Sequence, residues 1–296
     1  MKRALVTGAS GFIGSRLVAR LLADDWDVHV VLRPQSSLAL LSDVETRISV
    51  QWYSGATQQM LDILAASRPD VVFHLAAQAS ADHQALDIEQ MIASNVLLST
   101  QLAEAMVRSG VTRLVTTETF WQHRSGTEEY QPVCLYAATK QAARDMLRYY
   151  VDVGSINVIS LVLFDTYGPD DPRKKLINLL KEVARDGRPI EMTPGEQIVD
   201  LVHVDDVTSA YLRAADLLLE SVGAGLQTYA VSSGERMSLR DLVGLIERVC
   251  DLSFSIKWGG KPYRLNEVFN PWLGETLPGW RPKNGLAAGL RDVFGG

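Results

Sequence analysis

A tyrosine and a lysine four positions apart, Tyr136 and Lys140, form a pair whose chemistry depends on its spacing. On a helix such residues share a face, so the lysine ammonium lies near the phenol. A phenol with its ordinary pKa of about 10 is a poor acid–base catalyst at neutral pH, but an adjacent cation stabilises the phenolate. The pair predicts a proton donor or acceptor whose pKa Lys140 lowers. A surface tyrosine beside a surface lysine is the alternative.

Three glycines near the amino terminus, Gly8-x-x-Gly11-x-x-Gly14, form a second motif. Gly8 permits a tight turn, Gly11 lets backbone N–H groups approach a pyrophosphate, and Gly14 lets a helix lie against the preceding strand. The dipole of that helix favours an anion at its start. This motif, one residue longer than the usual Gly-x-Gly-x-x-Gly, predicts cofactor contacts at Gly8, Ser10, Gly11, Phe12, Ile13 and Gly14.

Arg33 follows a predicted strand, 26–32, at the position where such folds bind the adenosine ribose. An acidic residue there hydrogen-bonds the 2′-hydroxyl of NAD, whereas an arginine pairs with a 2′-phosphate. Arg33 therefore predicts NADP(H), with NAD(H) as the less favoured cofactor. A solvated arginine at a strand end is the alternative.

Two further segments are predicted to contact the cofactor. Leu75, Ala76 and Ala77 end a predicted strand, 70–75, where small residues let the backbone approach the centre of the cofactor; tight packing is the alternative. Asn95 lies on the apolar side of a long amphipathic helix predicted over 87–108. A buried asparagine must be hydrogen-bonded, either structurally or by holding a water or a main-chain kink near the active site.

Polar side chains are also expected at the ligand crevice from two other places. Thr117-Glu118-Thr119 follows a predicted strand, 111–116, and polar groups at the carboxyl edge of a parallel strand point into the crevice where ligands bind. Arg173-Lys174-Lys175 precedes a helix predicted over 176–185. These cations either meet a diphosphate or form a solvated helix start.

Strands and helices alternate along residues 1–153. Further strands are predicted at 1–5 and 48–52, and further helices at 15–22, 57–67 and 136–153. Alternating βαβ units imply a parallel sheet. The predicted fold is α/β, a Rossmann-type doubly wound parallel sheet with a smaller C-terminal α/β substrate domain. The dinucleotide-binding domain is expected at 1–165 and 205–235, and the substrate domain at 166–204 and 236–296.

Composition narrows the classes of partner. The 296 residues are 47% apolar, which is ample for a core. A net charge of −6 without a dense Lys/Arg patch argues against binding nucleic acid or an anionic membrane. No apolar run reaches the roughly 18 residues of a membrane span and no signal-peptide pattern is seen, so a cytoplasmic protein is expected. The two cysteines and five histidines show no ligand spacing, so no metal site is predicted.

The order of these motifs resembles one family, the extended short-chain dehydrogenases/reductases, also called the nucleotide-sugar epimerase/dehydratase family. The resemblance lies in Thr7-Gly8-x-x-Gly11-Phe12-Ile13-Gly14, His74-Leu75-Ala76-Ala77, Asn95-Val96, Thr117, Tyr136-x-x-x-Lys140, Phe164–Pro169 and Asp200–Asp206. It implies that Tyr136 exchanges a proton with the substrate, Lys140 holds the nicotinamide ribose, and Thr117 hydrogen-bonds the reacting oxygen. It also implies cofactor contact by Phe164 and a homodimer through helices 87–108 and 134–153.

Two departures from the family pattern bear on the reaction. Sugar dehydratases of the family carry Thr-Asp-Glu where this chain has Thr117-Glu118-Thr119, which weakens the dehydratase prediction. The family's diphosphate-binding arginine is here Val199, so the sugar nucleotide must be held differently. Substrate contacts are therefore expected from Glu118, Thr119, Asp165, Arg173 and Lys175.

Among the reactions of this family, a reduction requires the fewest catalytic groups: a hydride from NADPH, a proton from Tyr136 and a polarising hydroxyl from Thr117. Segments 116–122 and 163–169 resemble most closely the synthases of CDP-linked 3,6-dideoxyhexoses. The predicted function is NADPH-dependent reduction of the C4 keto group of a nucleotide-linked deoxy sugar, of the CDP-4-keto-3,6-dideoxyhexose type. The alternatives are a nucleotide-sugar epimerase or 4,6-dehydratase with retained NAD(P), and, from a different class, a non-catalytic NADP-sensing protein.

Overall fold

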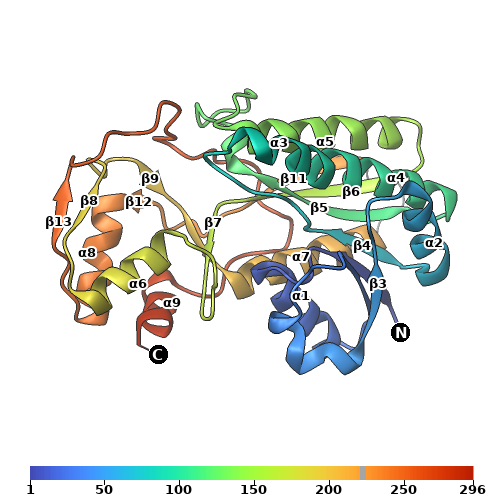
Figure 1. Ribbon diagram of the computed structural model, residues 1–296, viewed down its shortest axis with the longest axis horizontal. Coiled ribbons are helices and arrows are strands. Elements are labelled where there is room, and N and C mark those ends of the chain that lie inside the picture. The colour runs from blue at the N-terminus through green and yellow to red at the C-terminus, as the bar shows by residue number, and fades with distance from the viewer. Residues whose placement is uncertain (221–224, 296) are drawn as a thin grey trace.

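A seven-stranded parallel sheet forms the centre of the larger part of the molecule (Figure 1). The structure is a computed structural model that describes residues 1–220 and 225–295. The strand order is β11-β6-β5-β4-β1-β2-β3, so the chain winds outward in both directions from β1. The order reverses between β1 and β4, where such sheets bind ligands. The strands are β1 (Arg3–Thr7), β2 (Asp27–Leu32), β3 (Ile48–Trp52), β4 (Val71–His74), β5 (Arg113–Thr119), β6 (Asn157–Leu163) and β11 (Leu226–Val231).

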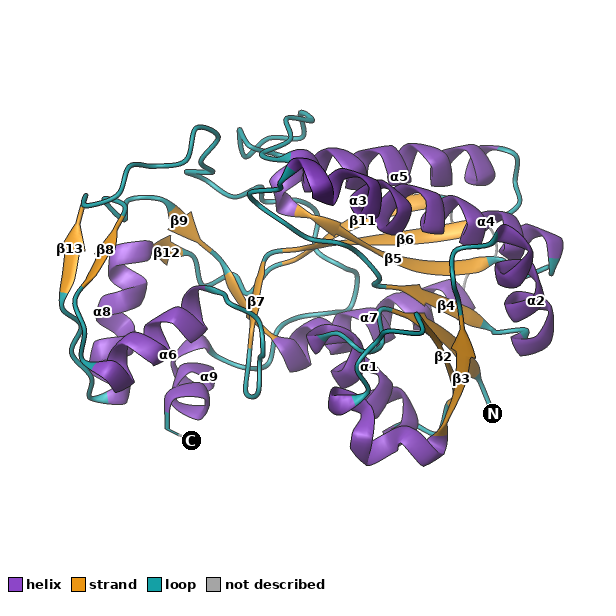
Figure 2. Ribbon diagram, viewed as in Figure 1, coloured by secondary structure: helices purple, strands orange, loops and turns teal. Residues whose placement is uncertain are grey.

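Helices cover both faces of this sheet (Figure 2). On one face α1 (Phe12–Ala23) packs against α7 (Val204–Glu220). The other face carries α2 (Thr57–Ser67), α3 (Ile88–Ile92), α4 (Leu98–Arg108) and α5 (Leu135–Asp152). Short 3₁₀ helices lie at Ala39–Arg47, Ala85–Asp87 and Phe120–Gln122. The predicted doubly wound α/β fold is confirmed.

The sequence forms these layers because its apolar residues follow two periods. β4 reads Val-Val-Phe-His and is buried at every position, as expected of a parallel strand covered on both faces. In α5 the buried positions, three or four residues apart, make one face of a helix. They are Ala137, Lys140, Ala143 and Leu147, with Thr139 beside them.

A smaller unit with its own apolar core lies beside the sheet, at the left of Figure 1. Its helices are α6 (Leu176–Asp186), α8 (Leu239–Cys250) and α9 (Leu286–Phe294). Its short strands are β7 (Asp165–Tyr167), β8 (Ile190–Met192), β9 (Ile198–Val199), β10 (Leu201–His203), β12 (Met237–Ser238) and β13 (Ile256–Trp258). No helix in the described ranges is both long enough and apolar enough to cross a bilayer.

The expected domain division stays a prediction, and some residues of the expected substrate domain, among them Val202, pack in the core of the large sheet. Trp272 and Trp280 belong to the core of the large sheet, although 236–296 was expected to lie wholly in the smaller unit. Burying two indoles there draws this irregular segment across the sheet, where Ala230 of β11 forms a bridge with Thr276. Within the expected ranges, residues 221–224 and 296 lie outside the described residues.

Two predicted elements differ from the observed ones. The helix expected at 87–108 is interrupted by a π-helical turn, Ala93–Leu97, which contains Asn95. The strand expected to end at Thr116 continues to Thr119. This extension matters because alternate residues of a strand face opposite sides of the sheet, so it fixes the directions of Thr117 and Glu118.

The glycine turn brings backbone segments into direct contact. Gly8 has φ +73°, and a Cβ there would lie 2.6 Å from the backbone nitrogen of Ala76 in the loop after β4. A Cβ on Gly14 would lie 2.1 Å from the carbonyl oxygen of Gly8. The roles predicted for both glycines, a tight turn and close helix–strand packing, match this geometry.

Gly14→Ala should therefore destabilise the protein by about 2 kcal/mol or more, because the new methyl group forces α1 away from the β1 turn. Gly244→Ala in α8 is the matched control, since its Cβ would meet only the movable Arg248 side chain at 3.3 Å. That change should stabilise α8 by up to about 1 kcal/mol, because alanine is the better helix former. Chemical denaturation of both variants checks this; similar stabilities would contradict the close approach.

Candidate active site

The turn between β1 and α1 is built to receive an anion. Gly11 is the N-cap of α1 and is exposed; no side chain caps this end, and its first turn contains no acidic residue. Unpaired N–H groups and the helix dipole favour a phosphate there. Ser10 and Ile13 beside it, and residues 75–77 across the crevice, are all at least partly exposed. The residues present therefore fit a dinucleotide.

Arg33 directly follows β2, and its side chain is exposed. Its backbone N–H donates to Ser36 Oγ (3.1 Å), which closes a short turn. Within the described parts of the chain, no carboxylate pairs with its guanidinium. The guanidinium is thus available to a phosphate group at the ribose end of the crevice.

His74, the last residue of β4, takes part in a directional chain of hydrogen bonds. Ser99 Oγ donates to the Asn95 carbonyl (2.7 Å), so it accepts from His74 Nε2 (2.8 Å). Nδ1 is then the acceptor for the Thr7 hydroxyl (2.7 Å), and Thr7 Oγ1 accepts from the N–H of Ala76 (3.2 Å). The imidazole is therefore neutral with its proton on Nε2, and it ties β1, β4 and α4 together.

Asn95 is fully buried within the π-helical turn. Its Oδ1 accepts from the N–H of Gln78 (2.7 Å), and its Nδ2 donates to the Gln78 carbonyl (3.1 Å) and the Thr139 hydroxyl (2.8 Å). Thr139 in turn donates to the Tyr136 carbonyl (2.7 Å). Asn95 thus positions the loop after β4 and the start of α5, whereas the sequence suggested a cofactor contact. Full burial is the reason for this correction.

Tyr136 and Lys140 lie in the first turns of α5, with the Tyr136 ring packed edge-on against Trp121 (centroids 6.3 Å apart). Burial raises the pKa of the Tyr136 phenol. Burial also lowers the pKa of Lys140 to about 8, while the charge of Glu118 opposes that change. The expected lowering of the phenol pKa by Lys140 is not found in the protein alone, because burial dominates. The phenol is therefore protonated at neutral pH.

Thr117 points to the α7 side of the sheet. Its hydroxyl donates to the His74 carbonyl (3.1 Å) and lies 2.5 Å from the hydroxyl of Tyr211 in α7. Tyr136 is close enough to contribute to the raised pKa of Tyr211, after burial, the largest cause. The structure thus brings Thr117 to the same region as Tyr136.

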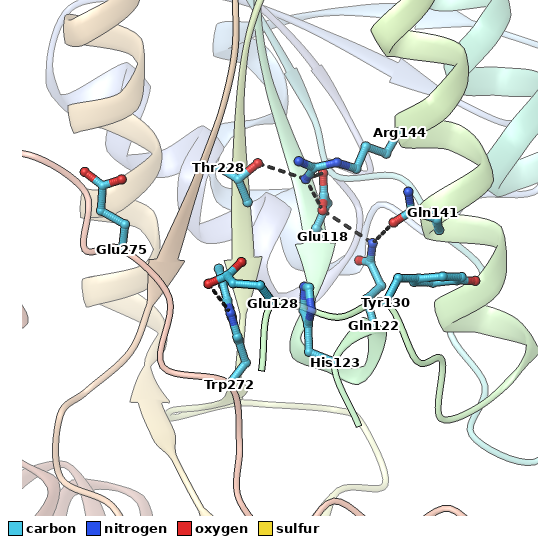
Figure 3. A pocket seen from close by; sticks show the side chains of 10 residues that line it. All are labelled: Glu118, Gln122, His123, Glu128, Tyr130, Gln141, Arg144, Thr228, Trp272 and Glu275. Carbon is cyan, nitrogen blue, oxygen red and sulfur yellow. Dashed lines mark hydrogen bonds and ion pairs between the residues drawn. The ribbon is translucent and has the colours of Figure 1, made fainter. Parts of the chain in front are cut away.

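Glu118 points to the opposite, α5 side of the sheet (Figure 3). Both its oxygens accept from Arg144 of α5 (3.0 and 2.9 Å), and Arg144 also donates to Thr228 of β11 (2.8 Å). The carboxylate predicted to hold a sugar hydroxyl is therefore engaged by Arg144 and does not meet the Thr117 hydroxyl. The pair lines a polar cavity of about 440 Å³, together with Gln122, His123, Glu128, Tyr130, Gln141, Trp272 and Glu275.

Thr119, also predicted to contact substrate, caps the 3₁₀ helix Phe120–Gln122. Its hydroxyl accepts from the N–H of Trp121 (3.3 Å), and its own N–H donates to Gln122 Oε1 (3.1 Å). Thr119 is 7% exposed. Its hydroxyl thus shapes the turn that carries Trp121 to Tyr136.

Arg173 lies at the cofactor side of the crevice with its charge already paired. Its guanidinium donates to both oxygens of Asp171 (2.8 Å each) and lies 4.6 Å from the ring centroid of Phe12, at the start of α1. A diphosphate would have to compete with Asp171 for this arginine. The prediction that Arg173 binds substrate diphosphate is thus weakened by the ion pair.

Lys175 and Asp165 are two further predicted substrate contacts, and Lys175 lies beside Trp121. Lys175 Nζ is 5.6 Å from the ring centroid of Trp121, which packs on Tyr136. Burial raises the pKa of Asp165, while the charge of Lys175 opposes the change. Lys175 is thus linked to Tyr136 through Trp121, and the substrate contacts of Lys175 and Asp165 stay predictions.

Phe164 packs beneath this region. It is 5% exposed, stacks on Phe120 (centroids 5.3 Å apart, planes at 13°) and is covered by the guanidinium of Arg236 at 5.1 Å. Arg236 is fixed by an ion pair with the buried Asp200 (2.9 Å). Phe164 thus belongs to the floor of the site, where its predicted cofactor contact stays a prediction.

Three residues of the site were missed from the sequence. Tyr211 lies on the apolar face of a helix and reads as an ordinary core residue. Arg144 reads as one more charged position of an amphipathic helix. Trp121 lies in segment 116–122, for which the sequence offers only a resemblance. Each is recognised by a contact with a residue distant in sequence, which spacing does not reveal.

Comparison with known proteins identifies the family. Residues 4–223 match the model of the NAD dependent epimerase/dehydratase family. The chain belongs to this family. A UDP-glucose 4-epimerase of Mycolicibacterium smegmatis is 30% identical over 97% of this chain and 96% of that protein. A CDP-abequose synthase of Yersinia pseudotuberculosis is 26% identical over 91% of each. The solved structure of MoeE5 in complex with UDP-glucuronic acid and NAD is 25% identical, with a TM-score of 0.82 over 99% of this chain and 98% of that one.

Membership of the NAD dependent epimerase/dehydratase family confirms the predicted resemblance and the prediction of an NAD(P)-dependent enzyme. The segment matched by the family model includes the glycine turn, Thr117 and the Tyr136–Lys140 pair. Tyr211 also falls within it.

Acid should destabilise this protein partly through His74. Burial lowers the pKa of His74 to about 3, with the charge of Lys140 acting in the same direction. The unfolded chain therefore binds a proton below pH ~6.5 that the folded chain excludes, so stability falls as the pH drops from there toward 3. His74→Asn should be less stable at pH 7 but lose less further stability down to pH 4. Urea denaturation at several pH values checks this; equal pH dependence in both proteins would contradict it.

Proposed function

We propose that this protein is an NADPH-dependent reductase of the C4 keto group of a nucleotide-linked deoxy sugar, of the CDP-4-keto-3,6-dideoxyhexose type. The bound dinucleotide would supply the hydride. The protonated Tyr136 would donate a proton to the carbonyl oxygen as that oxygen gains negative charge. Thr117 would hydrogen-bond the same oxygen, and Lys140 would hold the nicotinamide ribose.

The observation that carries the proposal is the state of the polar groups around Tyr136. A reduction needs an acid at the reacting oxygen, and the Tyr136 phenol carries its proton at neutral pH. A dehydration also needs groups that exchange protons with sugar carbons. Glu118 is held by Arg144, and Thr119 caps a turn, so neither is free for that role.

Arg33 supports the choice of cofactor. Its exposed guanidinium at the end of β2 suits the 2′-phosphate that distinguishes NADPH from NADH. The substrate would enter beside Lys175, whose ammonium lies over Trp121 and suits a phosphate, and Asp165, whose charge interacts with Lys175, would accept from a sugar hydroxyl.

A 4-epimerase is the second candidate, and one observation favours it. The UDP-glucose 4-epimerase of M. smegmatis is 30% identical to this chain, against 26% for the Y. pseudotuberculosis CDP-abequose synthase. An epimerase would use the same Tyr136 and Thr117 but retain its cofactor through oxidation and re-reduction. The two functions therefore differ in net consumption of NADPH.

We also propose a homodimer through α3, α4 and α5. Six large apolar side chains on α3, the π turn, α5 and the residue that follows α5 are exposed by more than a third, which is unusual for a free surface. They are Ile88 (42%), Ile92 (44%), Leu97 (46%), Met146 (44%), Tyr149 (63%) and Val153 (57%). A symmetric pairing of these helices would cover them.

Arg33→Ala should weaken NADPH binding about tenfold or more and leave NADH binding nearly unchanged, because only the 2′-phosphate contact is lost. Dissociation constants for both cofactors, in wild type and variant, measure this. Arg20→Ala, which removes an arginine from the last turn of α1, is the control and should change neither constant. A wild type that prefers NADH would contradict the assignment.

With a 4-keto-6-deoxy sugar nucleotide, the protein should consume one NADPH per product, with label from deuterated NADPH at C4. Tyr136→Phe should bind the cofactor normally but lose turnover by a factor of about 10² or more, because only the proton donor is removed. Tyr150→Phe is the control on the same helix; its hydroxyl donates to Glu104 (3.2 Å), away from the site. Interconversion of two sugars without net NADPH oxidation would establish the epimerase instead.

A further inference from the structure

Tyr211 is a buried phenol whose hydroxyl has one hydrogen-bonding partner among the described residues, Thr117 of the candidate active site. It is 0% exposed, and its hydroxyl lies 2.5 Å from Thr117 Oγ1. Burial raises its pKa, while the hydrogen bond with Thr117 opposes the change and Tyr136 adds to it. Tyr211 is therefore protonated at any working pH, and its proton must have an acceptor.

The direction of this hydrogen bond follows from the number of protons. Thr117 has one hydroxyl proton, which it donates to the His74 carbonyl at 3.1 Å. A hydroxyl whose proton is already donated in one hydrogen bond can still accept another through its lone pairs. The Tyr211 hydroxyl is therefore the donor to Thr117 Oγ1, and the chain runs from Tyr211 through Thr117 to the carbonyl at the end of β4.

We propose that Tyr211 is the positioning residue for Thr117, and that its hydrogen bond holds the Thr117 oxygen so that the Thr117 proton is presented to the reacting oxygen of the substrate. This inference rests on the proposed role of Thr117. When a carbonyl oxygen lies beside Tyr136, the Thr117 proton turns to it from the His74 carbonyl, and Thr117 still accepts from Tyr211. Hydrogen bonds in such chains polarise one another, so donation by Tyr211 makes Thr117 the stronger donor.

The proposal makes the effects of Tyr211 and Thr117 dependent on each other. Thr117→Val should lower kcat about a hundredfold, as loss of one oxyanion donor does. Tyr211→Phe should lower kcat about tenfold with little change in KM. In the Thr117→Val background, Tyr211→Phe should have no further effect on kcat, because the residue it acts through is gone.

Tyr167→Phe is the matched control, because the Tyr167 hydroxyl is buried without a hydrogen-bonding partner in the described structure. It should leave kcat unchanged. Circular dichroism melting and NADPH titration of all variants separate folding and cofactor binding from turnover.

The outcomes are distinct. Equal kcat in Tyr211→Phe and wild type, or effects on kcat that simply multiply in the double variant, would overturn the positioning role. The ratio of variant to wild-type kcat tests Tyr211 in either direction of the reaction, since a reductase and an epimerase place the same oxygen at Thr117. Net NADPH oxidation by the wild type separately tests the proposed function. If the wild type does not oxidise NADPH, the ratio of Tyr211→Phe kcat to wild-type kcat still tests the positioning role.

Discussion

The tautomer of one buried imidazole fixes the geometry of the site. His74 is 1% exposed, and its Nε2 must donate to Ser99 Oγ, because the Ser99 hydroxyl already donates its proton to the Asn95 carbonyl. Its Nδ1 must then accept from Thr7. Reversing any of these hydrogen bonds would leave two donors or two lone pairs facing each other among buried residues, which is costly. The turn after β1, through Thr7, and the start of α5, through Ser99 and Asn95, are thus both linked by hydrogen bonds to the His74 ring.

Burial affects the pKa values of Tyr136 and Lys140 more strongly than the interaction between the two residues does. Lys140 is 3% exposed, and its pKa falls to about 8, so its charge is only weakly favoured near neutral pH. Glu118 is the carboxylate that supports it, yet Glu118 shares its charge with Arg144. Burial likewise raises the pKa of the Tyr136 phenol, so the phenol stays protonated near neutral pH. A bound cofactor would change this balance by excluding more water and by offering hydroxyls to Lys140.

Local spacing predicted the parts of the site that depend on a single turn or helix. The glycine turn and the Tyr136–Lys140 pair follow from backbone geometry within a few residues. The direction of Glu118 did not follow, because the strand was expected to stop at Thr116 and instead continues to Thr119. Because side chains alternate along the strand, Glu118 faces Arg144, 26 positions away in sequence, and Thr117 faces Tyr211, 94 positions away. Such contacts depend on how layers pack, which periodicity does not specify.

The same dependence on packing explains why the irregular carboxyl-terminal segment has a defined place over the site. Asp200 is 2% exposed and accepts from Ser232, Ser233 and Arg236. Arg236 also donates to the Pro271 and Trp272 carbonyls, so one buried ion pair fastens this segment to both units of the molecule. A buried pair adds little net stability compared with apolar residues, but breaking it leaves an uncompensated charge. The Asp200–Arg236 ion pair therefore serves mainly to position the loop that carries Trp272, which it holds against the large core.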